Sequence, residues 1–103
     1  EWGRGRIIRL SPARAREGPM TNRKRLQQAL SGPQNMRFGE LVSLVEAFGF
    51  RLSRTSASHH IYVHPQIREL VNLQNVGGKA KAYQVRQFLR LIERYNLQLR
   101  ESE

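Results

Sequence analysis

The spacing of apolar residues changes at Gly49, and this change limits the folds that the chain can adopt. Before Gly49, apolar residues recur every three or four positions, which predicts an amphipathic helix over 38–48 with Gly49 as its C-terminal cap. After Gly49 the period becomes two, with Phe50 and Leu52 separated by polar residues, as in a β-strand. A helix that passes directly into strands is typical of an α+β domain.

The remaining periodic segments complete this pattern. They predict helices at 22–30 and 82–96, strands at 59–64 and 70–74, and a polar hairpin connection at 53–58. The sequence thus predicts an α+β fold with a three-stranded antiparallel sheet, two helices on one face of it, and a short N-terminal helix. We expect that N-terminal helix to pack on the core through Leu26 and Leu30, or to contact a partner.

One small domain is all that 103 residues can support. Five arginines and two glutamates stand among glycines and prolines in residues 1–19, which we expect to be a disordered leader or upstream sequence. The expected domain, 20–103, contains 13 basic and 6 acidic residues, so it carries most of the formal net charge of +10. A strongly basic domain predicts a polyanionic partner, nucleic acid first.

The composition also excludes several classes of protein. There is no cysteine, which excludes a disulfide scaffold and zinc sites that require thiolates. No apolar run is long enough for a membrane-spanning helix, and the first ten residues lack the apolar core of a secretory signal. We therefore expect a cytoplasmic protein with no membrane partner and no small-molecule cofactor.

All three histidines, His59, His60 and His64, lie within six residues. Metal binding is not expected, because His60 and His64 are far apart on an extended strand and the chain has no cysteine or aspartate to complete a site. A Ser-His-acid triad is not expected either, because the chain has no aspartate and no nucleophile-elbow pattern. A single histidine could instead act as a general acid/base on RNA, whose own 2′-OH can attack the adjacent phosphate. The alternative for each histidine is ordinary packing in a strand.

Strand alternation divides the histidines between two faces. His59 shares a face with Ile61 and Val63, which have the character of core residues. His60 falls on the other face with Tyr62 and His64, which we expect to be the wetter one.

Several short motifs occur in a recognisable order. A helix ends in Gly49-Phe50, a basic strand follows, and Ala57-Ser58-His59 leads into an aromatic strand that closes with His64-Pro65. A Gly78-Lys79 loop and a final helix come next. In this order and spacing, over roughly residues 36–97, the chain resembles the HicA toxins of HicA–HicB toxin–antitoxin systems. Ala57 stands where that family usually has glycine.

The resemblance implies a double-stranded-RNA-binding-domain-like fold and a metal-independent mRNA endoribonuclease, an mRNA interferase. It also implies a HicB-like antitoxin that occludes the active site. The family's catalytic histidine corresponds to His59; His60 is the alternative, because some members carry that histidine one place along. The competing hypothesis is a non-catalytic double-stranded-RNA-binding module of the same fold.

Five further residues are candidates for contacts with RNA. A phosphate is the expected ligand of the cations Lys79, Lys81, Arg54 and Arg86, and Tyr62 is a candidate for stacking on a base. Arg86 begins a ridge of arginines spaced four residues apart on the last helix, where it is the nearest of them to the helix start.

Overall fold

The computed structural model describes residues 21–99, and the expected leader at 1–19 lies outside them. In chain order the elements are α3 (Asn22–Ser31), the 3₁₀ helix η1 (Pro33–Asn35), α4 (Phe38–Ala47), β2 (Arg51–Ser56), β3 (His59–Val63), β4 (Val71–Val76), β5 (Lys79–Ala80) and α5 (Ala82–Tyr95). The three α-helices begin and end within one residue of their predicted bounds, and the α+β class is confirmed.

The sheet has four antiparallel strands in the order β2-β3-β4-β5, whereas the sequence predicted three. The additional strand, β5, follows β4 after a two-residue turn at Gly77 and Gly78, which was expected to be a plain loop. Both glycines have positive φ, 60° and 85°, as a type I′ hairpin turn requires. A two-residue strand is too short to leave a periodic signal in the sequence, which is why this strand was missed.

The first hairpin is tighter than expected. Residues 53–58 were predicted to be a connection, but β2 continues to Ser56, and the turn consists of Ala57 and Ser58 alone. β2 is an edge strand with every residue exposed, so its small polar residues have the composition of a loop although they pair with β3. Its register shifts between Leu52 and Arg54, which indicates a β-bulge at the intervening serine.

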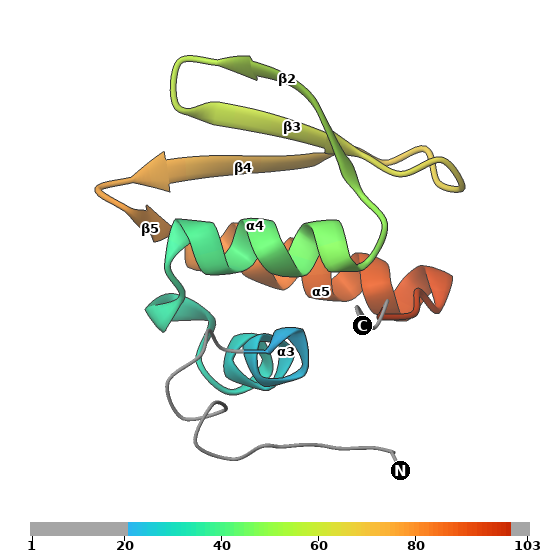
Figure 1. Cartoon of the computed structure of the whole chain (residues 1–103), viewed down its shortest axis with the longest axis horizontal. Helices are drawn as coiled ribbons and strands as arrows, with labels where there is room; N and C mark the ends of the chain where they lie inside the picture. The colour runs from blue at the N-terminus through green and yellow to red at the C-terminus, as the bar shows by residue number, and fades with distance from the viewer. Residues whose placement is uncertain (1–20, 100–103) are drawn as a thin grey trace, which may run out of the picture.

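Helices α4 and α5 cover one face of the sheet, and α3 lies on the far side of these helices (Figure 1). Most of the core lies between the sheet and α4/α5. Its largest fully buried side chains are Phe50, Phe88, Met36, Leu41, Leu44, Leu73, Val45 and Val85. The opposite face of the sheet has no helix over it in the described part of the chain (Figure 1).

The assignment of strand faces in β3 corrects the sequence analysis. His60, Tyr62 and His64 face the helices, with Tyr62 only 3% exposed, whereas His59 and its alternate residues lie on the uncovered face. The register explains the difference, because His60 pairs with Leu73, which is fully buried. The aromatic ring of Tyr62 is apolar and packs in the core. The prediction that Tyr62 lies on the wetter face considered only its hydroxyl.

Helix α3 begins at an N-cap, Thr21, whose hydroxyl accepts a hydrogen bond from the Lys24 N–H (3.2 Å). It packs on the core through Ala29, which is fully buried, and through the partly buried Leu26. Leu30 was predicted to pack there too, but it is 64% exposed, because it follows Ala29 by one residue and so points about 100° away around the helix. Among residues 21–99, no helix is both long and apolar enough to cross a membrane.

Candidate functional site

His59 is the first residue of β3, directly after the turn that joins β2 to β3. Of the two turn residues, Ala57 has positive φ (55°) and Ser58 does not. The closing pair of the hairpin is Ser56 with His59. The turn therefore places His59 at the end of the sheet, on its uncovered face.

The imidazole of His59 is held by Asn72 of β4. His59 Nδ1 lies 3.2 Å from Asn72 Oδ1, and the His59 ring is partly exposed. An amide oxygen only accepts hydrogen bonds, so this contact is made by the form of histidine that carries a proton on Nδ1. In the neutral ring Nε2 then carries the lone pair and can accept a proton.

A second polar residue of β4 stands beside this histidine. Gln74 is directly opposite His59 in the register, and its Nε2 donates to Ser58 Oγ (3.3 Å), which links β4 to the hairpin turn. Asn72 and Gln74 were not among the predicted site residues. The available signal was their alternation with Val71 and Leu73, which places them on the solvent face of the predicted strand.

Cations surround the same face. Side chains of directly paired residues point to the same side of a sheet. Arg54 pairs with Ile61, two residues from His59, and Lys79 pairs with Val76, two residues from Gln74. The predicted residues Arg54 and Lys79 therefore lie on the face that carries His59, and both are exposed.

Arg37 is a cation that the sequence analysis missed. It forms an isolated antiparallel bridge with Lys79, and the neighbouring Phe38 N–H donates to Gly78 O (2.9 Å). The segment before α4 is thereby fixed beside β5. Only the fold brings these two exposed cations together, because they are 42 residues apart in the sequence.

The other predicted RNA contacts lie elsewhere. Lys81 is the N-cap residue of α5, with Nζ 5.7 Å from the centre of the Tyr83 ring. Arg86 is exposed on α5, in the helical layer. Tyr62 belongs to the core, where burial, together with the charge of Glu46, raises the pKa of its phenol, and its ring offers no free surface for a base.

The two other histidines have structural environments. The His60 ring lies against Phe38 (centroids 4.9 Å apart), and its Nδ1 is 3.2 Å from Ser58 O. His64 is buried against Phe50, and its Nδ1 accepts a hydrogen bond from the Gln66 N–H (3.1 Å). Within the described residues, no three His, Cys, Asp or Glu side chains are grouped so that they could hold a metal ion.

Comparison with known proteins identifies the family. The model of the HicA toxin of bacterial toxin–antitoxin systems matches residues 38–93, more than half of the chain, from the start of α4 to near the end of α5. No curated protein matches the chain, and no solved structure does. The matched segment contains His59, Asn72 and both glycines of the second turn. The chain therefore belongs to the HicA toxin family.

Proposed function

We propose that this protein is an mRNA endoribonuclease in which His59 transfers protons. The observation that carries the proposal is the environment of His59: a partly exposed imidazole on the uncovered face of the sheet, with Nδ1 bonded to Asn72 and Nε2 left to meet a substrate. Membership of a toxin family adds the expectation of a harmful activity, and RNA cleavage needs few chemical groups.

The reaction proceeds without a covalent enzyme intermediate. His59 Nε2 removes the proton of a ribose 2′-OH, the 2′-oxygen attacks the adjacent phosphorus, and the bond from phosphorus to the 5′-oxygen breaks. The products are a 2′,3′-cyclic phosphate and a free 5′-hydroxyl, after the leaving oxygen takes up a proton. General acid–base catalysis of this kind contributes roughly 10²–10⁴-fold to a rate.

The cations supply the electrostatic part of the reaction. Arg54, Lys79 and Arg37 are exposed around the face that carries His59, and we assign to them the binding of the phosphates on either side of the cleaved bond. Their positive charge also offsets the charge that develops on the phosphorane, which is the general role of pre-placed cations in phosphate chemistry.

Geometry favours His59 over His60 as the catalytic residue. A general base must reach the proton that it removes. The His60 ring packs against Phe38 on the helix side of the sheet, and its Nδ1 is engaged with a backbone carbonyl. The partly exposed His59 ring lies instead on the uncovered face of the sheet, where its Nδ1 is bonded to Asn72.

The toxin family implies an antitoxin partner. We propose that this partner is a HicB-like protein that covers the face bearing His59 and so keeps mRNA away from it. An mRNA substrate also requires the protein to act in the cytoplasm.

The direct test is cleavage of a defined RNA by the purified wild-type protein and by His59→Ala, with His60→Ala as the matched control. We expect His59→Ala to lose at least about 100-fold in rate while its circular dichroism spectrum is unchanged. His60→Ala should keep its activity within a few-fold, although it should be less stable without the Phe38 contact. Cleavage should persist in EDTA and should stop at a ribose whose 2′-OH is replaced by hydrogen.

Each alternative has a distinct outcome. An inactive His60→Ala beside an active His59→Ala would transfer the catalytic role to His60. Loss of cleavage in EDTA would contradict a metal-independent reaction. Salt-dependent binding of duplex RNA without any cleavage would favour the non-catalytic RNA-binding module.

A further inference from the structure

The outer edge of β4 is paired along only part of its length. β3 pairs with β4 from Val71 to Gln74 on one side, whereas on the other side β5 reaches only Asn75 and Val76. Within the described residues, the edge from Val71 to Gln74 therefore has no strand beside it. An open edge of this kind is a template for the addition of another strand.

The hydrogen bonds of β4 show which backbone groups point outward. Asn75 N–H donates toward β3, to Ser58 O (3.2 Å), whereas Gln74 N–H points the other way and donates to Gln84 Oε1 on α5 (2.8 Å). Backbone direction alternates along a strand, so the N–H and C=O of Asn72 also point away from β3. These two groups lack a strand partner at the open edge.

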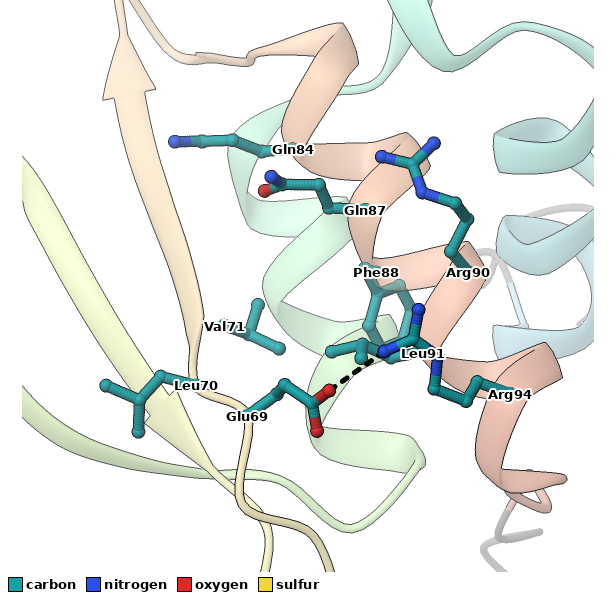
Figure 2. A pocket seen from close by; sticks show the side chains of 9 residues that line it. All are labelled: Glu69, Leu70, Val71, Gln84, Gln87, Phe88, Arg90, Leu91 and Arg94. Atoms are coloured by element: carbon teal, nitrogen blue, oxygen red, sulfur yellow. Dashed lines mark hydrogen bonds and ion pairs between the residues drawn. The ribbon is translucent and has the colours of Figure 1, made fainter.

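A groove runs between this edge and α5 (Figure 2). Its volume is about 260 Å³, room for only a few side chains, and less than most small-molecule sites require. Its apolar lining comes from Val71, Phe88 and Leu91, with the exposed Leu70 at its rim. An apolar floor beside an unpaired strand edge suits a peptide whose alternate side chains point into the groove.

The charge of the groove selects an acidic peptide. Its cations are Arg90 and Arg94, and its one carboxylate, Glu69, is bonded to Arg94 (3.0 Å) and to the Tyr95 hydroxyl. Figure 2 shows Arg94 directed toward Glu69 while Arg90 extends away from that pair. Arg90 is therefore the cation of the groove that is left for a carboxylate on a ligand.

We infer that this groove binds an extended, acidic segment of a partner protein, which adds to β4 at Asn72 and places a carboxylate beside Arg90. Protein is favoured over RNA because the lining includes an apolar floor and a carboxylate, Glu69. The β2 edge is a poorer template, since its register shifts near Ser53, where it bulges. The inference does not rest on RNA cleavage, because the groove lies beside α5 and His59 lies on the other face of the sheet.

The test is an NMR titration of the ¹⁵N-labelled full chain with a seven-residue peptide of alternating glutamate and valine, blocked at both ends. We expect the amide of Asn72 to shift and binding of about 1 mM or tighter. Arg90→Glu should weaken binding about tenfold, whereas Arg86→Glu, the same change one turn earlier on α5, should alter it less than about twofold. The matching lysine–valine peptide should not bind.

Other outcomes would overturn the inference. They are the absence of shifts at millimolar peptide, shifts confined to β2, or equal losses in the two arginine variants, which would indicate a general charge effect. A short single-stranded RNA that shifts Asn72 more strongly than the peptide would assign the groove to nucleic acid instead. Because the readout is binding, failure here leaves the activity of His59 untouched.

Discussion

Replacing Ala57 by glycine should stabilise the protein. Ala57 is the first residue of the turn between β2 and β3, and its φ of 55° lies in the left-handed region, where the Cβ of an L-residue is crowded. Glycine has no Cβ and adopts positive φ without this crowding.

Two opposing effects set the magnitude. The left-handed conformation costs alanine roughly 1–2 kcal/mol, which Ala57→Gly would relieve. Glycine also gives the unfolded chain more freedom, which lowers stability by about 0.4–1 kcal/mol. The net gain is then about 1 kcal/mol. For a domain of this size, that corresponds to a rise of about 4–8 °C in the midpoint of thermal unfolding.

Thermal unfolding followed by circular dichroism measures this change. The matched control is Ala82→Gly at the first position of α5, where the backbone is helical and the same substitution should lower the midpoint. A fall in the midpoint of Ala57→Gly would refute the argument that this turn is strained. RNA cleavage by Ala57→Gly should equal that of the wild type, because the turn that presents His59 keeps its geometry.

Three further predictions concern single contacts. Asn72→Ala should slow RNA cleavage about tenfold, which corresponds to the loss of a hydrogen bond of about 1.4 kcal/mol. In the same variant, ¹⁵N NMR should show that the neutral ring of His59 no longer favours the proton on Nδ1. Gln84→Leu should lower the free energy of unfolding in urea by about 1–3 kcal/mol, because a backbone N–H of β4 loses its acceptor, whereas Gln84→Glu keeps one. The pKa of Glu69 is lowered mainly by the hydrogen bond from Tyr95. The ionised carboxylate therefore stabilises the fold above its ordinary pKa of 4.5. This stabilisation is lost as the pH falls through the lowered pKa. Tyr95→Phe should therefore lose less stability than the wild type between pH 7 and pH 3.

The sequence was sufficient for the elements with a strong period. The three predicted helices have regularly spaced apolar residues, and Gly49 also marks the end of α4. The sheet was harder to predict, because β2 is an exposed edge strand of small polar residues and β5 has only two residues. Neither strand buries an alternating apolar face, which is the signal that a period-two pattern depends on.

The residues of the candidate site could likewise be predicted only in part. His59 was identified through a local motif, and its cations Arg54 and Lys79 could be named because each is adjacent to a recognisable turn or strand. Asn72 and Arg37 reach the site through strand pairing over 13 and 42 residues, and a single sequence carries no measure of such pairing. The polar hydroxyl of Tyr62 also led to the prediction that this residue faces solvent. In the structure Tyr62 is buried, because its apolar ring packs in the core.

The turn at Ala57 also determines which of two adjacent histidines lies on the open face of the sheet. Successive residues of a strand face opposite sides, so a shift of one residue in the β2–β3 register would exchange His59 and His60 between the open face and the helices. The register is fixed by a turn of only two residues, which pairs Ser56 with His59 and sets His60 opposite Thr55. The same register is stabilised on the helix side by the His60–Phe38 contact and on the open side by the His59–Asn72 contact. The left-handed backbone at Ala57 is thus part of the structure that presents His59, and a change in the length of this turn would alter the candidate site more than any substitution of a surrounding cation.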